Sequence, residues 1–286
     1  MQTLGLMVEL RETIRAWRAA GDRIAFVPTM GNLHDGHLRL VDEARRECDR
    51  VVVSVFVNPS QFGPSDDFGA YPRTPAEDAG KLRALGVDLL YLPEVAEIYP
   101  DDPAHMTFVE VPGLSDDLCG GFRPGHFRGV ATVVLKLFNQ VQPNLAVFGE
   151  KDFQQLTMVR RMVRDMDLPV EILGVPTVRE PTGLAMSSRN AYLGEDDRVR
   201  AGLLYAGLCQ AAETLHQGCR DFSGIEVRQI SLLTEAGFSV DYFAIRRQDD
   251  LLVPRLEDER LVVLVAARLG RTRLIDNLKV CLYHPS

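Results

Sequence analysis

Residues 23–48 of this 286-residue chain read RIAFVPTMGNLHDGHLRLVDEARREC. The apolar run Arg23–Val27 predicts a strand, and Val41, Ala44 and Cys48 share the face of a helix predicted over Leu38–Cys48. A turn with two glycines and two histidines lies between them. This strand–turn–helix order is typical of an α/β fold.

The same alternation continues through the first two thirds of the chain. Short runs rich in Val, Ile, Leu and Phe suit strands that helices cover on both faces. We therefore expect a Rossmann-like, doubly wound parallel sheet, which binds ligands beyond the C-terminal ends of its strands, where the strand order reverses. Further strands are expected at Val51–Val57, Val87–Leu92, Asn144–Phe148 and Val170–Leu173, further helices at Gly129–Val141 and Asp152–Met166, and a capped helix start with a capping glutamate at Thr74-Pro-Ala-Glu77.

A smaller C-terminal α+β domain is expected after a hinge. Residues Gly174–Gly183 contain two prolines and two glycines, which predicts a boundary and divides the chain into domains 1–179 and 180–286. Helices followed by consecutive strands indicate an antiparallel sheet. The expected helices are Glu195–His216 and Gly224–Ala236, and the expected strands are Val240–Arg246, Leu261–Arg268 and Thr272–Val280.

Composition excludes several classes of protein. The net charge of −8 disfavours a nucleic-acid-coating protein but allows a locally positive pocket for a small anion. The longest apolar run, 261–267, is too short to span a bilayer, and the N-terminus lacks the pattern of a signal peptide. Five scattered cysteines without a CxxC pair predict free thiols in a reducing cytoplasm.

Two segments contain cationic groups suited to an anionic ligand. His34 and His37 lie in a turn before a helix start, whose N–H groups favour anions, although solvated loop histidines or a metal site are alternatives. Lys151 follows another expected strand, and the chain contains 28 Arg but only 4 Lys. A lysine in such a chain indicates a position that requires a compact positive charge rather than a planar guanidinium. The alternative is a solvated helix start with Asp152 as its N-cap.

Two further polar segments complete the candidate site. Residues 186–190, Met-Ser-Ser-Arg-Asn, would bind an anion after the hinge, although any polar loop can have this composition. Asn58 and Gln61, in the segment 56–63, can both donate and accept hydrogen bonds and so recognise hydroxyl and carboxylate groups, although Asn-Pro also begins ordinary turns.

Six motifs follow one another along the chain: PTMGxLHxGH at 28–37, FVNPxQFG at 56–63, YPRT at 71–74, RPGHF at 123–127, GEKD at 149–152, and PTVRE at 176–180 with MSSRN at 186–190. Together these motifs resemble the pantoate–β-alanine ligase family. They cover about residues 26–190, and the C-terminal third matches in length and in Asp276-Asn277. Asn32, where a small residue is expected, and Phe153, where Tyr is usual, depart from the pattern; the first puts ATP affinity in doubt.

The resemblance implies ATP-dependent condensation of (R)-pantoate with β-alanine through a pantoyl adenylate, releasing AMP and pyrophosphate. It implies that His37 is the proton donor and that His34 and Lys151 take part in catalysis. The residues implied to bind the small-molecule substrates are Gln61, Gln155, Asn58 and Tyr71. The resemblance further implies Mg²⁺ that enters with ATP, no metal site of the protein's own, no tightly bound organic cofactor, and a cytoplasmic homodimer without nucleic-acid or membrane partners. The implied ATP-binding residues are Met30, Gly31, Asn32, Leu33, His34, Asp35, Gly36 and His37, then Gly149, Glu150, Lys151 and Asp152, and finally Val178, Met186, Ser187, Ser188 and Arg189.

The sequence also allows three rival hypotheses. A dinucleotide-forming transferase would need a cationic site for its acceptor phosphate, whereas Asn58, Gln61 and Gln155 are neutral. A relative of aminoacyl-tRNA synthetases would need a tRNA-binding domain, for which the acidic, short chain leaves no evident segment. A regulatory nucleotide-binding module would bind ATP without pantoate-dependent pyrophosphate exchange.

Overall fold

The computed structural model describes residues 1–64, 66–101 and 105–282. By its internal contacts the chain divides into two compact units. The first comprises Met1–Glu150 and Met158–Pro176, and the second comprises Lys151–Thr157 and Thr177–Ser286. The expected roles of domains 1–179 and 180–286 stay a prediction.

The first unit is built on a parallel sheet, as the alternating pattern predicts. Its described residues form six strands in the order β1-β4-β3-β2-β5-β6. From β2 the chain adds β3 and β4 on one side, whereas β5 and then β6 are added on the other side of β2. The strand order therefore reverses at a switch point between β2 and β5, which pair through Ala25↔Leu145 and Phe26↔Ala146. The bounds are β1 Gln2–Leu4, β2 Ile24–Thr29, β3 Arg50–Val55, β4 Leu89–Tyr91, β5 Leu145–Gly149 and β6 Glu171–Val175.

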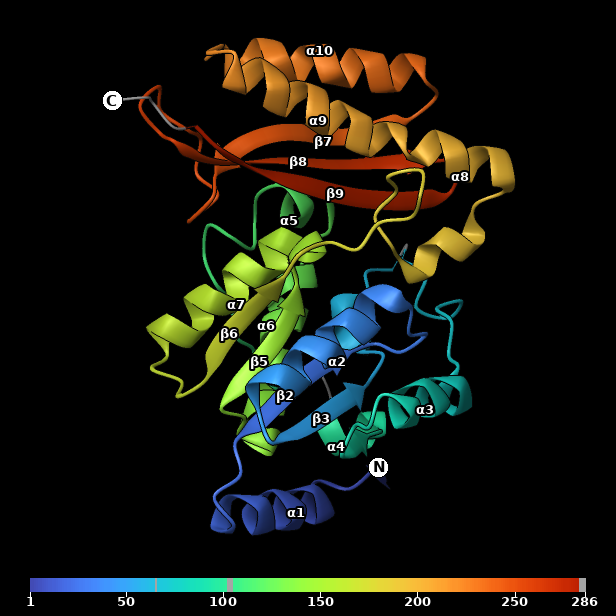
Figure 1. Ribbon diagram of the computed structural model, residues 1–286, viewed down its shortest axis with the longest axis vertical. Helices are drawn as coiled ribbons and strands as arrows, with labels where there is room; N and C mark the ends of the chain where they lie inside the picture. The colour runs from blue at the N-terminus through green and yellow to red at the C-terminus, as the bar shows by residue number, and fades with distance from the viewer. Residues whose placement is uncertain (65, 102–104, 283–286) are drawn as a thin grey trace. The chain divides into compact units, whose positions relative to one another are not determined.

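Helices cover both faces of this sheet. On one face, α2 (Asp35–Glu47) packs Leu40, Val41 and Ala44 against β2, β3 and β5 (Figure 1). On the other, Phe138 of α6 (His126–Val141) contacts Phe26 and Phe148 edge to face. The remaining helices are α1 Met7–Ala19, α3 Pro75–Ala84, α4 Val95–Ile98, α5 Cys119–Phe122 and α7 Phe153–Asp165, with short 3₁₀ turns η1 at Pro59–Gln61 and η3 at Glu150–Asp152.

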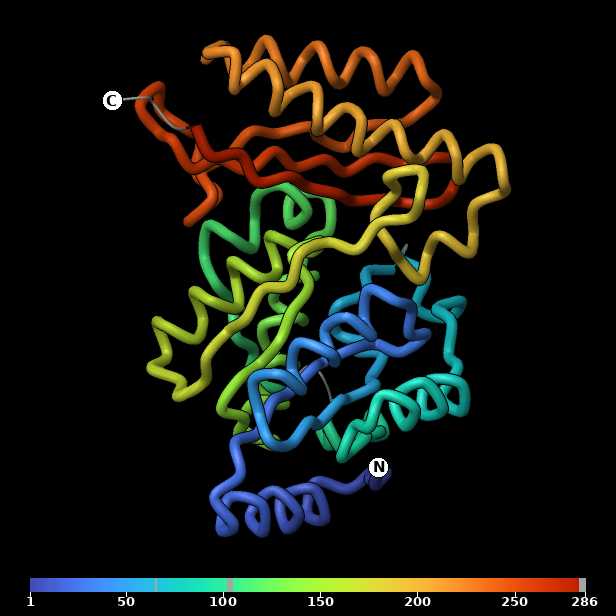
Figure 2. The backbone as a smooth tube through the Cα atoms, viewed as in Figure 1, coloured from blue at the N-terminus to red at the C-terminus, as the bar shows by residue number. Residues whose placement is uncertain are grey.

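The second unit contains an antiparallel sheet under two helices. Its strands follow one another in the order β7-β8-β9, and their adjacent traces are visible in Figure 2. Helices α9 and α10 pack on one face of this sheet through an apolar cluster that includes Leu208, Phe243 and Val263. The bounds are η4 Ser188–Tyr192, α8 Glu195–Ala201, α9 Leu203–His216, α10 Phe222–Glu235, β7 Ser239–Arg247, β8 Arg260–Leu269 and β9 Thr272–Cys281.

The expected fold class is confirmed, with four local corrections. The pattern missed β1 and α1, because β1 has only three residues and α1 buries only Leu10 and Ile14. The expected helix Glu195–His216 is interrupted at Gly202, whose backbone lies so close to Thr182 that a Cβ would be 2.4 Å from its carbonyl oxygen. Expected strand Val87–Leu92 is shortened to Leu89–Tyr91.

The fourth correction concerns the start of α3. Thr74 is the N-cap and Pro75 the first helical residue, as expected, but the Thr74 side chain makes no capping bond to the backbone. Glu77 is exposed, and the Thr74 hydroxyl instead donates to Asp78 (3.3 Å). Asp78 is fully buried, and this position proves important for the histidine turn.

Candidate active site

The turn after β2 has a backbone that only particular residues adopt easily. Gly31 has φ +82°, and a Cβ there would lie 2.8 Å from a Val55 methyl group. Asn32 follows with φ +50°, in the left-handed region that Asn tolerates better than Ala. The departure from the family pattern at Asn32 therefore suits the local backbone.

Asp78 holds this turn in place from helix α3. Its two carboxylate oxygens accept the backbone N–H groups of Asn32 (2.9 Å) and Leu33 (2.8 Å). The neighbouring Lys81 ammonium donates to the Leu33 carbonyl (2.6 Å). Sequence reasoning missed Asp78; the signal was a carboxylate at a position that faces the sheet in the first turns of the helix.

His34 and His37 close the N-terminus of α2 together. The Gly36 N–H donates to His34 Nδ1 (3.1 Å), and the His34 N–H donates to His37 Nδ1 (3.3 Å). The two rings lie 4.1 Å apart between centroids. Because each Nδ1 accepts a backbone hydrogen, the neutral form of each ring carries its own hydrogen on Nε2, which makes Nε2 a donor.

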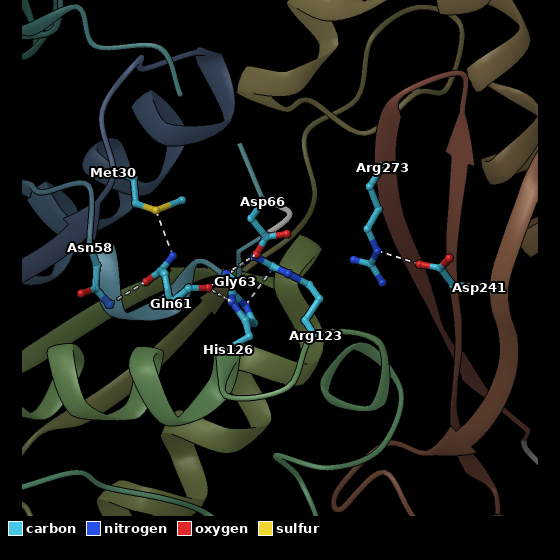
Figure 3. Close-up of polar contacts among 9 residues, drawn as sticks. All are labelled: Met30, Asn58, Gln61, Gly63, Asp66, Arg123, His126, Asp241 and Arg273. Atoms are coloured by element: carbon cyan, nitrogen blue, oxygen red, sulfur yellow. Dashed lines mark hydrogen bonds and ion pairs between the residues drawn. The ribbon is translucent and has the colours of Figure 1, made fainter. Parts of the chain in front are cut away.

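Gln61 belongs to a buried amide network at the end of β3 (Figure 3). The Asn58 amide donates to Gln61 Oε1 (3.1 Å), and Gln61 Nε2 donates to the Met30 thioether (2.9 Å). Both Asn58 and Gln61 are buried. Two predicted substrate-binding residues and one predicted ATP-binding residue therefore meet in the first unit.

An ion-pair cluster borders this network on the other side of Gln61 (Figure 3). The Gln61 carbonyl lies 2.8 Å from His126 Nδ1, and Arg123 forms an ion pair with Asp66 (2.9 Å). Burial raises the pKa of Asp66, but the Gly63 N–H and the Arg123 guanidinium outweigh it and lower that pKa below its usual value. The cluster uses Arg123 and His126 of the 123–127 motif, to which the sequence assigned no role.

Tyr71, Gly149 and Glu150 complete the predicted residues of the first unit. Tyr71 is buried with its ring edge-on to Phe62, 5.9 Å between centroids. Gly149 ends β5 and Glu150 follows it, so both lie at the C-terminal end of a strand that pairs with β2. They occupy the strand end at the switch point, where this architecture binds ligands.

In the second unit, β9 fixes the backbone at Lys151. The Asn277 amide donates to the Lys151 carbonyl (2.9 Å), and the Asn277 N–H donates to Asp276 (2.8 Å). Arg179 binds both oxygens of Asp276, at 2.6 and 3.0 Å, and lies over the Tyr205 ring, 3.7 Å from its centroid. Burial raises the pKa of Asp276 despite the opposing effect of Arg179.

The segment 178–190 folds into a small hairpin in the same unit. Met186 N–H donates to the Val178 carbonyl (2.9 Å), and Arg179 pairs with Ala185. Ser187 caps η4 by accepting the Arg189 N–H (3.3 Å). This hairpin and the start of η4 therefore contain five of the predicted ATP-binding residues, namely Val178, Met186, Ser187, Ser188 and Arg189.

Three further predicted residues are exposed or half-buried on helices. Asp152 is exposed in η3, and Gln155 is half-buried in the first turns of α7. Asp35 is exposed at the first position of α2. Within residues 1–64, 66–101 and 105–282, no three His, Cys, Asp or Glu side chains are arranged to hold a metal ion.

Comparison with known proteins places the chain in a family. The family model described as pantoate-beta-alanine ligase matches residues 2–279. The chain belongs to the pantoate-beta-alanine ligase family. It is therefore a pantoate–β-alanine ligase, an enzyme of pantothenate biosynthesis. This membership leaves the rival hypotheses of a different transferase or a non-catalytic module without support.

Relatives match the ligase over nearly its whole length. The pantothenate synthetase of Methylococcus capsulatus is 61% identical over 282 residues, covering 99% of each chain, and that of Halorhodospira halophila is 54% identical, covering 94% and 95%. The crystal structure of the Thermus thermophilus pantothenate synthetase superposes with a TM-score of 0.90 at 47% identity, covering 97% of this chain and 99% of that one. The Francisella tularensis ligase, crystallised with beta-gamma ATP and beta-alanine, gives 0.81 at 33% identity, covering 97% of each.

Proposed function

We propose that this ligase uses ATP to form a pantoyl adenylate, releases pyrophosphate, and then transfers the pantoyl group to β-alanine with release of AMP. The observation that carries the proposal is the reciprocal cap of His34 and His37, in which each Nδ1 accepts a backbone hydrogen and the Nε2 of each neutral ring carries its hydrogen, at a helix N-terminus beside the switch point. The Francisella relative crystallised with beta-gamma ATP and beta-alanine supports the substrates.

In the first step, a pantoate carboxylate oxygen attacks the α-phosphorus of ATP, and the bond to the bridging oxygen of pyrophosphate breaks. Negative charge grows on the phosphate oxygens, so catalysis depends on donors and cations placed to meet it. We assign this role to the Nε2–H of His37 and His34 and to the Lys151 ammonium. Mg²⁺ bound to ATP would neutralise phosphate charge and need few protein ligands.

The remaining ATP contacts are assigned to backbone groups and small hydroxyls. Turn 30–37, the strand end Gly149–Glu150 with Asp152, and the hairpin with Val178 and Met186–Arg189 would bind the nucleotide. The Asn190 amide holds this hairpin in shape by donating to Glu180 (2.7 Å) and to the Ala185 carbonyl (3.1 Å). Gln61, Gln155, Asn58 and Tyr71 would recognise pantoate.

In the second step, the neutral amine of β-alanine attacks the acyl carbon of the adenylate, AMP leaves, and the nitrogen loses a proton. Water must be excluded, because it would hydrolyse the mixed anhydride. That residues 180–286 act as a lid stays a prediction, which hydrogen–deuterium exchange with and without nucleotide would test. A cytoplasmic homodimer without nucleic-acid or membrane partners is also proposed, and light scattering would test the dimer.

The deciding experiment is pantoate-dependent exchange of labelled pyrophosphate into ATP, run without β-alanine. Exchange establishes acid activation, and its absence in an enzyme that still makes pantothenate would refute the adenylate. His37→Ala and Lys151→Ala should each reduce turnover by about a hundredfold or more with the fold intact, and His37→Ala should also lose about 1 kcal/mol of stability because a capping bond of α2 is removed. The matched controls His216→Ala and Lys279→Ala, both at exposed positions, should stay near wild type.

None of the helices formed by the described residues has the length and apolar character that a membrane-spanning helix needs. The five cysteines, all among the described residues, form no disulfide with one another.

A further inference from the structure

Two backbone groups show which end of the Asn58 amide is the oxygen and which is the nitrogen. Its Oδ1 accepts the Ser60 N–H (3.3 Å), and its Nδ2 donates to the Gly129 carbonyl (3.2 Å). A backbone N–H can only donate and a backbone carbonyl can only accept, so rotating this amide by 180° would place two donors and two acceptors face to face. The two ends of the Asn58 side chain are therefore distinguished.

This orientation determines how Gln61 meets a ligand. The Asn58 Nδ2 is a donor, so the Gln61 atom 3.1 Å away must be Oε1. Gln61 Nε2 then points the other way, toward the Met30 thioether, which is a weak acceptor. An amide nitrogen has two hydrogens, so Gln61 presents an N–H donor to whatever lies beyond it.

Tyr99 completes the acceptor side of Asn58. Its hydroxyl donates to Asn58 Oδ1 (2.8 Å) and lies 3.0 Å from the Ser60 hydroxyl, which itself donates to Asn58 Oδ1 (2.9 Å). Tyr99 is only 7% exposed, and the Lys136 ammonium lies 5.7 Å from its ring centroid. Burial raises the pKa of Tyr99, so the hydroxyl keeps its hydrogen at neutral pH.

We propose that Tyr99 is a positioning residue, which acts through Asn58 to make Gln61 a hydrogen-bond donor toward an oxygen of the acid substrate. Asn58 then acts on the acid through Gln61, since both hydrogens of its Nδ2 and its Oδ1 are already engaged within the protein. This inference rests on the proposed function, in which Gln61 binds pantoate. It adds a residue outside the six motifs to the machinery that selects the acid.

The test variant is Tyr99→Phe, which removes one hydroxyl and keeps the ring. Loss of one hydrogen bond in the network should raise the pantoate KM about five- to tenfold, with kcat and the ATP KM within about twofold of wild type. The matched control is Tyr91→Phe, because Tyr91 is also buried and its hydroxyl donates to a different amide, that of Gln140 (3.1 Å). This control should lose stability without a change in the pantoate KM.

A double-mutant cycle connects the effect to Gln61. Gln61→Ala should raise the pantoate KM by about ten- to a hundredfold, and adding Tyr99→Phe should then change it no further. The inference is overturned if Tyr99→Phe behaves like Tyr91→Phe, if the two effects multiply, or if Gln61→Ala has no effect. Failure of the proposed function would look different, because the wild-type enzyme itself would then show no pantoate-dependent pyrophosphate exchange.

Discussion

Asp78→Asn should damage both stability and nucleotide affinity, although Asp78 lies 46 residues from Asn32, whose N–H it binds. The carboxylate accepts two backbone hydrogens in a fully buried position. An amide keeps one oxygen and places an NH₂ group against the other N–H. One charge-assisted hydrogen bond is lost and a buried donor is left without an acceptor, which together cost about 2–4 kcal/mol.

Part of this cost should appear as a smaller population of the correctly folded histidine turn. The apparent ATP affinity falls in proportion to that population, so we expect an ATP KM about tenfold higher. The assays are urea unfolding and steady-state kinetics at saturating pantoate and β-alanine. The matched control is Glu77→Gln, one position earlier on the exposed side of α3, which should change stability by less than about 0.5 kcal/mol. Equal behaviour of the two variants would refute the assignment of Asp78 as the anchor of the turn.

Three further predictions follow from the backbone and from one ion pair. Gly129→Ala should raise the pantoate KM, because the added Cβ would lie 2.3 Å from the Ser60 carbonyl oxygen. The control Gly80→Ala places its Cβ in open space on a helix and should stabilise the enzyme slightly. Equal kinetics for the two variants would contradict the close contact between Gly129 and the Ser60 backbone. Asn32→Ala should lower the free energy of unfolding in urea by about 1–2 kcal/mol and Asn32→Gly by much less, because the backbone φ at this position is +50°. An Ala variant as stable as wild type would contradict this prediction, because the turn would then have to change its backbone conformation. The pKa of Asp66 is lowered in the folded enzyme, so this carboxylate stabilises the fold above the unfolded pKa near 3.8, and the stabilisation is lost as pH falls through the folded pKa. The difference in unfolding free energy between wild type and Asp66→Asn should therefore shrink as pH falls below about 4. A difference that stays constant with pH would count against the ion pair between Asp66 and Arg123.

The sequence predicts the layers of this fold better than its connections. Buried strands such as Arg50–Val55 are recognisable because both faces are apolar, and α6 because its apolar positions repeat with helical spacing. The edge strand Gln2–Leu4 has no such signal, because only Leu4 is buried. The break at Gly202 depends on the distant carbonyl of Thr182, which no local pattern contains.

The candidate site shows the same division. Residue types and their place after strands indicate His34, His37 and Gln61, since parallel strands end at one edge of a sheet. The residues that hold them, Asp78 and Tyr99, come from other elements and act through hydrogen bonds to the backbone or to an amide. Such partners are defined by three-dimensional position, so spacing along the chain does not reveal them.

The reciprocal cap of His34 and His37 has a consequence for how this ligase can evolve. A serine or asparagine could replace the acceptor at the helix start but would offer no ring N–H, and a lysine could offer a donor but could not accept the backbone hydrogen. Imidazole combines an acceptor and a donor on different edges of one ring. Substitution at either position therefore loses at least one of the two functions, because serine or asparagine keeps the capping acceptor without the ring N–H, and lysine keeps a donor without the capping acceptor.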